Sequence, residues 1–342
     1  MDEYYEANIG KLHEEDFEAK MGKATGESIE EFRKKRLLRT SSNDVAPQEG
    51  CEKIIQALMA VPTQIQRTPE WYAFRHNLLT ASSVYKALGS NAKRNELICE
   101  KCAPIREIKA NPQAMLDGAF HHGIKYEPLS ALYYEHVNGA TLQEFGCIAH
   151  PEHPFLGASP DGVNVNPASP TYGRAVEIKN PISRVVTGNP KLEYWVQVQV
   201  QLAVCGLKQC DFLETKFEEY AGLSEFEADG VFTTTADGKM KGMFLYVMCG
   251  DSGKYVYPPF QCTKEVYEEW EKGVLTTMTW VHTICWKLAA VSCVLIEYNH
   301  KWFMKAVPLF EELWATILAE RENGAWVQRL PKKRVKENKK EI

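Results

Sequence analysis

The chain carries Ser159-Pro160-Asp161-Gly162 and, after residues 163–176, Glu177-Ile178-Lys179-Asn180-Pro181. Because a strand points alternate side chains to one face, Glu177 and Lys179 would lie on one side of a strand, and Val176 and Ile178 in a core on the other. A carboxylate and an ammonium on one face, joined by Asp161 from a neighbouring turn, suit an oxygen-ligand metal such as Mg²⁺, or a lysine that orients or deprotonates a water. The alternative is an exposed Glu/Lys pair beside an unrelated Asp-Gly turn.

The composition is that of an ordinary globular protein. Of the 342 residues, 44% are hydrophobic, 11% aromatic and 25% charged, and the net charge is −5. There is no apolar run of about 18 residues, so no membrane span is expected. The first residues predict no secretory signal, and the ten scattered cysteines are expected to be reduced thiols. An acidic total argues mildly against a nucleic-acid binder, but nucleases also concentrate carboxylates where metals bind.

The sequence divides into three parts. Residues 1–67 are a charged helical extension with a linker at 40–50, residues 68–325 are the main domain with its core at 68–217, and residues 326–342 are a basic tail. We expect helices at 51–60, from Thr68, from about Thr80, at 123–137 with a bend near Pro128, at 193–205, at 263–290 and at 300–322. We expect strands at 142–148, 175–179 and 210–217, a strand or turn at 155–157, and a hairpin of 244–248 with 254–257.

Further polar residues surround the two motifs. Glu127 lies on a predicted helix and could bind a metal directly or through water. In the stretch from Tyr194 to Gln201, a helix would place Tyr194, Gln197 and Gln201 on one face, whereas a strand would place Gln197, Gln199 and Gln201 together. An amide both donates and accepts hydrogen bonds, so either arrangement suits holding a water or a lysine.

Arg75 and Ser82 form a candidate phosphate site. A guanidinium fork combined with a hydroxyl near a helix N-terminus matches the geometry and charge of a phosphate. The alternative for Arg75 is an ordinary surface arginine.

In sequence order, these features resemble the lambda exonuclease-like (YqaJ) viral recombinase branch of the PD-(D/E)xK nucleases, especially members encoded by large DNA viruses. The resemblance covers roughly residues 68–217. It is carried by Glu70-Trp71, Arg75, Thr80-Ala81-Ser82, Gly123…Glu127, Ser159-Pro160-Asp161-Gly162, Glu177-Ile178-Lys179-Asn180-Pro181 and Tyr194…Gln197-Val198-Gln199.

The resemblance implies an α/β (α+β) fold with a restriction-endonuclease-like core, in which a central mixed β-sheet is flanked by helices. It implies hydrolysis of DNA phosphodiesters at duplex ends, often 5′→3′, with one or two Mg²⁺ or Mn²⁺ ions, in recombination, repair or replication. It further implies a single-strand annealing protein as a partner, a ring-shaped homotrimer in some relatives, and an intracellular location in the host.

The resemblance also assigns roles to residues. Asp161, Glu177 and the Ile178 carbonyl would bind the metal, with Glu127 as a direct or outer ligand. Lys179 would activate or position the attacking water, and Gln197 would support that water or the lysine, with Tyr194 and Gln199 as supporting residues. Arg75 and Ser82 would receive the 5′-phosphate.

Three other signals remain. In RecB-like and Cas4-like relatives a histidine upstream of the first acid binds metal, which makes His121 or His122 a weaker candidate ligand. Cys99 and Cys102 form a C-x-x-C, but a zinc or iron–sulfur site needs about four ligands, so no iron–sulfur cluster is expected. The basic stretch 331–336 resembles a nuclear import signal and could equally be a DNA-contacting arm or a solvated tail.

Two other functions are alternatives to the exonuclease. One is a structure-selective or Cas4/RecB-like endonuclease. The other is a non-catalytic DNA-binding or partner-recruiting protein on a nuclease fold, which would be expected to have lost its acids or its lysine, and here both are present.

Overall fold

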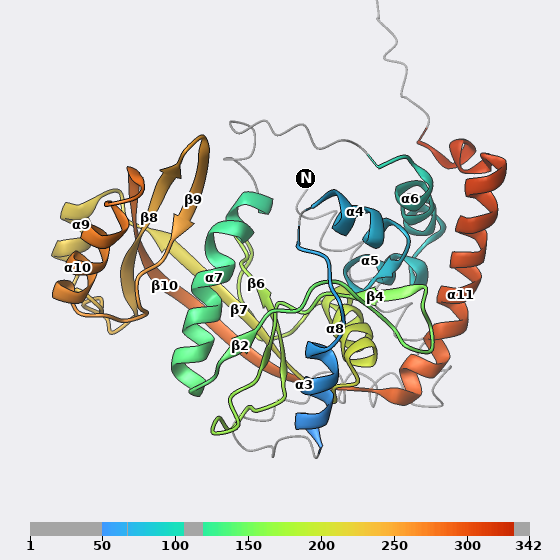
Figure 1. Ribbon diagram of the computed structural model, residues 1–342, viewed down its shortest axis with the longest axis horizontal. Helices are drawn as coiled ribbons and strands as arrows, with labels where there is room; N and C mark the ends of the chain where they lie inside the picture. Colours follow the sequence, from blue (N-terminus) through green and yellow to red (C-terminus); the bar gives the residue numbers. More distant parts are fainter. Residues whose placement is uncertain (1–49, 67, 106–118, 332–342) are drawn as a thin grey trace, which may run out of the picture.

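Two β-sheets and their surrounding helices make up the computed structural model, which describes residues 50–66, 68–105 and 119–331 (Figure 1). Residues 1–49 of the predicted extension at 1–67, and residues 332–342 of the predicted tail at 326–342, lie outside the described residues. None of the helices in the described part of the chain combines the length and apolar character that a bilayer crossing needs. The helices are α3 (Cys51–Met59), α4 (Pro69–His76), α5 (Ala81–Leu88), α6 (Asn91–Cys102), α7 (Ala119–Asn138), α8 (Leu192–Cys205), α9 (Leu223–Ala228), α10 (Lys264–Val274), α11 (His300–Asn323) and the 3₁₀ helix η2 (Ala325–Arg329).

The larger sheet has seven strands in the order β2-β5-β6-β7-β10-β8-β9. Only β6 and β7 run parallel within it, so the sheet is mixed. A second sheet of three short strands has the order β1-β4-β3. The strands are β1 (Leu79–Thr80), β2 (Leu142–Gln143), β3 (Ile148–Ala149), β4 (Leu156–Ala158), β5 (Gly162–Asn164), β6 (Ala175–Lys179), β7 (Gln209–Glu219), β8 (Lys241–Cys249), β9 (Ser252–Val256) and β10 (Thr279–Glu297).

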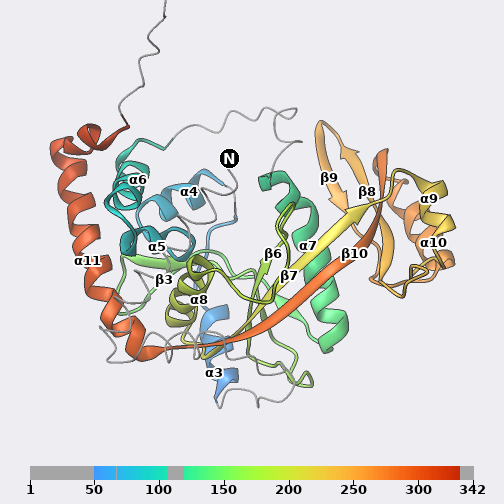
Figure 2. The ribbon, with the colours of Figure 1, turned by 180° about the vertical axis from the view of Figure 1, so that it is seen from behind.

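Helices cover both faces of the sheet at its centre. Val176 and Ile178 of β6 pack with Tyr134 of α7, whereas Ala175 belongs to the core around Trp195 of α8. Figure 1 shows α7 in front of the strands, and Figure 2 shows α8 on the opposite face. The predicted central mixed sheet flanked by helices is therefore confirmed, and so is the alternation along β6.

The long strand β10 joins this centre to the far end of the molecule. Its second half, from Trp286, pairs with β7, while its first half pairs with β8 up to Lys287. The β8–β9 hairpin, α9 and α10 surround the first half, at the end opposite α11 (Figure 1).

Two predictions of secondary structure are wrong. The predicted helix at 263–290 ends at Val274, and the chain then enters β10 at Thr279. This strand is rich in β-branched residues, which pack well on a pleated surface, and both its edges are partly paired. The predicted strand at 142–148 is two short strands, β2 and β3, which belong to different sheets.

The other predicted elements are present with shifted ends. Thr68 caps α4 by accepting a 3.3 Å hydrogen bond from the Trp71 backbone N–H, with Pro69 in the first turn. Pro128 lies inside α7, and the stretch from Tyr194 to Gln201 is helical rather than extended. This last result decides which glutamines share a face.

Candidate active site

The buried carboxylate of Glu177 is the centre of the candidate site. It is 1% exposed, on the face of β6 that meets α8. Its Oε1 accepts hydrogen bonds from the Lys179 ammonium and, at 2.7 Å, from the Gln197 amide, and its Oε2 accepts one of 2.6 Å from the Gln201 amide. Four polar side chains from one strand and one helix therefore meet at one point.

Asp161 joins this group from the turn between β4 and β5. Its Oδ2 accepts a 2.7 Å hydrogen bond from the backbone N–H of Ile178, in the next strand along the sheet. Burial raises the pKa of Asp161 well above its ordinary value, and the Glu177 charge raises it further, against the opposing effect of Lys179. Crowded carboxylates of this kind favour either a proton or a bound cation.

The backbone of β6 offers one more oxygen to this group. The N–H and C=O of a strand residue point to the same edge, so the Ile178 carbonyl faces the same side as its N–H, toward Asp161. The β5 ladder ends at the pair Gly162 and Val176 and leaves this part of the edge without a strand partner. Glu127 of α7 is exposed, and its charge contributes to raising the pKa of Asp161.

These groups fit a hard cation. Mg²⁺ prefers oxygen ligands and keeps several waters, so two carboxylates and a carbonyl suffice. Among the described residues, no group of three or more His, Cys, Asp or Glu side chains is arranged to hold a metal ion. Glu177 accepts hydrogen bonds from its amide and ammonium partners and Asp161 accepts one from an amide N–H, and each carboxylate keeps further lone pairs for a cation.

Lys179 is held as an ammonium. Burial lowers the pKa of Lys179, but the charges of Glu177 and Asp161 and the hydrogen bond to Glu177 outweigh burial, and the net effect is a raised pKa. The Tyr194 ring lies 5.3 Å from Nζ, which adds a cation–π contact. In this arrangement the ammonium donates a hydrogen bond to the Glu177 carboxylate.

Two further charged residues were missed by the sequence reasoning. Glu214 on β7 is paired in register with Lys179 and is 1% exposed. Arg184, from the loop after β6, forms an ion pair with Glu214 and lies 5.8 Å from the Tyr194 ring. Neither residue belongs to a motif that the sequence reveals. Strand pairing brings Glu214 beside Lys179, and the path of the loop after β6 brings Arg184 to Glu214. The sequence places Gln201 on the same helix face as Tyr194, but no motif marks Gln201 as a site residue.

Two of the supporting candidates lie elsewhere. The Gln199 amide donates 2.9 Å to the Glu297 carbonyl and accepts 2.6 Å from the Asn299 N–H, so it holds the junction between β10 and α11. The His122 ring lies tilted against the Tyr126 ring, with the centroids 4.6 Å apart, and the pKa of His122 is lowered by burial and by Lys125. Neither residue touches the carboxylates, because Gln199 projects from the opposite side of α8 from Gln197 and Gln201.

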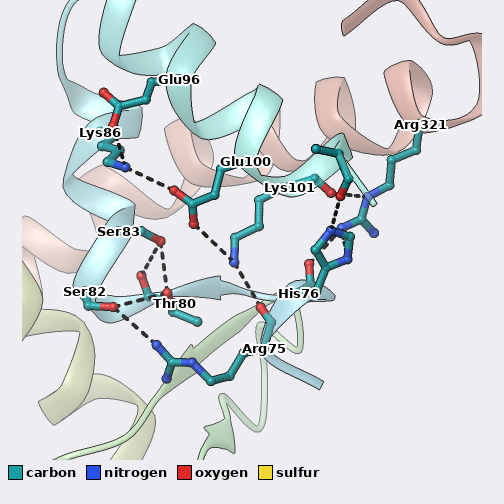
Figure 3. A network of polar contacts seen from close by, with 11 residues as sticks. Arg75, His76, Thr80, Ser82, Ser83, Lys86, Glu96, Glu100, Lys101 and Arg321 are labelled. Carbon is teal, nitrogen blue, oxygen red and sulfur yellow. Dashed lines mark hydrogen bonds and ion pairs between the residues drawn. The ribbon is translucent and has the colours of Figure 1, made fainter. Parts of the chain in front are cut away.

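The candidate phosphate residues do come together. The Arg75 guanidinium lies 4.4 Å from the Trp71 ring centroid and donates a 3.5 Å hydrogen bond to Ser82 Oγ (Figure 3). Ser82 is exposed in the first turn of α5, where free backbone N–H groups favour an anion. The buried hydroxyls of Thr80 and Ser83 bond each other at 2.9 Å and fix this turn.

The C-x-x-C pair is structural. Cys99 and Cys102 donate weak hydrogen bonds to the carbonyls of Trp326 and Ile317, at 3.7 and 3.5 Å. Burial raises the pKa of both thiols, which disfavours the thiolate that a metal needs.

Comparisons with known proteins bear on the core of the chain. Residues 70–208 match the model of the YqaJ-like viral recombinase domain, which confirms the resemblance inferred from the motifs. Uncharacterized protein R354 of Acanthamoeba polyphaga mimivirus is 28% identical over 329 residues, covering 83% of this chain. The chain spans 58% of the length of that relative.

Solved structures of two exonucleases are also similar. An alkaline exonuclease from Laribacter hongkongensis, LHK-Exo, is 22% identical, with a TM-score of 0.44 over 76% of this chain and 98% of that chain. A phage related exonuclease from Haemophilus somnus 129PT is 14% identical, with a TM-score of 0.35 over 71% of this chain and 96% of that chain.

Proposed function

We propose, from the YqaJ-like viral recombinase domain that residues 70–208 carry, that this chain is a metal-dependent exonuclease that hydrolyses duplex DNA from its ends. The observation that carries the proposal is the meeting of Glu177 and Lys179, which share a face of β6, with Asp161, which bonds to the edge of the same strand. We further propose 5′→3′ polarity, a role in viral recombination, repair or replication inside the host cell, and association with a single-strand annealing protein and with further copies of the chain.

Asp161, Glu177 and the Ile178 carbonyl would hold Mg²⁺ or Mn²⁺, and Glu127, whose charge acts on Asp161, would contribute directly or through water. A bound divalent cation lowers the pKa of a water and neutralises charge on the scissile phosphate. The protein's part is to keep two carboxylates aligned at a site where their mutual repulsion favours a cation.

Lys179 would stabilise charge rather than accept a proton. Its raised pKa keeps the ammonium protonated near neutral pH, so it has no lone pair for the proton of the attacking water. It can instead donate hydrogen bonds to that water or to a phosphate oxygen as negative charge develops. Gln197 and Gln201 hold the Glu177 carboxylate in a fixed orientation from α8.

Arg75 and Ser82 would bind the terminal 5′-phosphate. The guanidinium is stacked on Trp71 and directed at the first turn of α5, so a phosphate between them would receive donors from two sides. Binding the end of the strand in this way would place the next phosphodiester bonds toward the carboxylates and favour exonucleolytic over internal cleavage.

The test is cleavage of linear duplexes with a 5′-phosphate or a 5′-hydroxyl, beside a closed circle, with Mg²⁺ or with a chelator. We expect degradation of the linear DNA alone, faster with the phosphate, and lost in Asp161→Asn. Asp251→Asn, in the exposed turn between β8 and β9, is the matched control and should retain activity. Cutting of the circle would indicate the endonuclease, and binding without cleavage the non-catalytic protein.

A further inference from the structure

Helix α4, which carries Arg75, has an unusual means of support. None of its eight residues is fully buried, although residues 71–76 are half-buried, so packing alone holds the helix only in part. Its last backbone carbonyls are instead bonded by side chains from two distant helices, α6 and α11 (Figure 3).

The first of these side chains is Lys101 of α6. It is 5% exposed, and its Nζ donates a 3.0 Å hydrogen bond to the carbonyl of Arg75 itself. The carboxylate of Glu100 lies 3.9 Å away. The pKa of Lys101 is lowered to about 8, chiefly by burial and also by the charges of Arg75 and Arg321, against the opposing charge of Glu100.

The second is Arg321 of α11, whose guanidinium donates to three groups in two segments. It donates 2.7 Å to the His76 carbonyl, 3.0 Å to the Asn77 side chain and 2.8 Å to the Lys101 carbonyl. It also contacts the His76 ring at 3.2 Å. A single side chain of α11 therefore fixes the last turn of α4 to the end of α6.

We propose that Lys101 and Arg321 are positioning residues that set α4 so that Arg75 faces Ser82, and that they thereby determine the preference for 5′-phosphorylated ends. This inference rests on the proposed function of Arg75 and Ser82.

The physical reason is that α4 is short and only half-buried. The Arg75–Ser82 distance is already 3.5 Å, at the limit of a hydrogen bond, so a small rotation of α4 would separate the two donors. Lys101 and Arg321 fix the carbonyl end of α4 from outside, and a displaced guanidinium could not share a phosphate with the α5 N-terminus. The carboxylates on β6 touch neither Lys101 nor Arg321 and would not be affected.

The experiment compares Arg321→Gln, Arg321→Lys and Lys101→Met with the wild type on 5′-phosphate and 5′-hydroxyl duplexes. We expect the KM for phosphorylated ends to rise about tenfold in Arg321→Gln, with kcat and the KM for hydroxyl ends nearly unchanged. Arg321→Lys keeps the charge but lacks the fork, so it should recover only part of the preference. In an Arg75→Ala background, Arg321→Gln should have no further effect on the preference.

Arg94→Gln is the matched control. Arg94 also joins α6 to α11, through a 3.1 Å ion pair with Glu312, but it does not contact α4, and its loss should leave the preference intact. Thermal unfolding shows whether each variant is folded.

Anisotropy of labelled 5′-phosphorylated and 5′-hydroxyl duplexes, measured in chelator, gives a readout that does not need cleavage. Absence of cleavage with a preserved binding preference would contradict the proposed nuclease but not the positioning role. A wild type that does not distinguish the two ends would overturn the inference, and so would an unchanged preference in folded Arg321→Gln and Lys101→Met.

Discussion

Gln201 on α8 donates a 2.6 Å hydrogen bond to Oε2 of Glu177 on β6, and this contact joins a helix to a strand at a buried carboxylate. The amide's own Oε1 is buried and has no hydrogen-bond partner in the described structure. An amide oxygen without a partner can accept a hydrogen bond from a water or from a displaced side chain when the site rearranges. The relationship assigns Gln201 a part in orienting Glu177.

Replacing Gln201 with leucine should weaken metal binding. The change leaves Oε2 of Glu177 without its donor, at a cost of roughly 1–3 kcal/mol, and frees the carboxylate to turn. Loss of such outer partners typically lowers metal affinity or activity about 10–100-fold. Titration of activity against Mg²⁺ measures this effect, and Gln199→Leu is the matched control on the other side of α8. That control should lower the Tm by releasing Asn299 but leave the metal dependence unchanged, and equal metal dependence in both variants would contradict the role of Gln201.

Asp161→Asn should stabilise the metal-free protein at neutral pH. A carboxyl whose folded pKa is raised binds more protons in the folded than in the unfolded state, so its contribution to stability falls as pH rises through the folded pKa. The amide carries no charge and can still accept the bond from Ile178. Thermal unfolding from pH 5 to 8 in chelator should show a higher Tm and a flatter pH dependence than the wild type.

Added Mg²⁺ should raise the Tm of the wild type but not that of Asp161→Asn, because only a ligand that binds the folded state stabilises it. Asp251→Asn should follow the wild type in both measurements. A pH dependence that survives in Asp161→Asn would show that another group is responsible.

The centre of the site could be predicted because its residues are close in sequence and obey a period. Alternation along β6 alone places Glu177 opposite the core residues Val176 and Ile178. The choice between helix and strand for the glutamines was left open by the pattern, since Gln197, Gln199 and Gln201 alternate like a strand. The segment is helical, and burial of α8 against the sheet accounts for this conformation.

The parts that could not be predicted depend on contacts between distant segments. Trp286 and the following residues form a strand because β7 and β8 pair with them, and no local pattern records those partners. Arg321 lies 220 residues from Lys101 in sequence and belongs to no motif, yet it holds the helix that presents Arg75. The candidate carboxylates and lysine could therefore be identified from local motifs, whereas the distant contacts that support them could not.

Loss of Arg184 should destabilise the protein through Glu214. The carboxylate is 1% exposed, and removing its partner leaves a buried charge beside β6. Because Arg184 is itself partly exposed, we expect a cost at the lower end of ~3–5 kcal/mol for Arg184→Leu. The double variant Arg184→Leu/Glu214→Gln should recover most of that loss in urea unfolding, since the charge is gone. Failure of the second change to restore stability would show that the ion pair does not govern this region.

Lys101→Met should remove a pH dependence of stability on the alkaline side. The folded pKa of Lys101 is about 8 and the ordinary value is 10.5, so between these pH values the unfolded chain binds more protons than the folded one. The stability of the wild type is therefore expected to rise with pH across this window, by an amount on the order of 3 kcal/mol from this group. Methionine fills a similar volume without a charge, so the variant should be more stable than the wild type at pH 7, and its stability should rise less with pH.

Urea unfolding at pH 7, 8.5 and 10 measures how the free energy of unfolding changes with pH in both proteins. Lys93→Met, at an exposed lysine on the same helix, is the control and should keep the wild-type slope. Equal slopes in Lys101→Met and the wild type would mean that this ammonium titrates like an exposed lysine, and that its bond to Arg75 forms at no cost from burial.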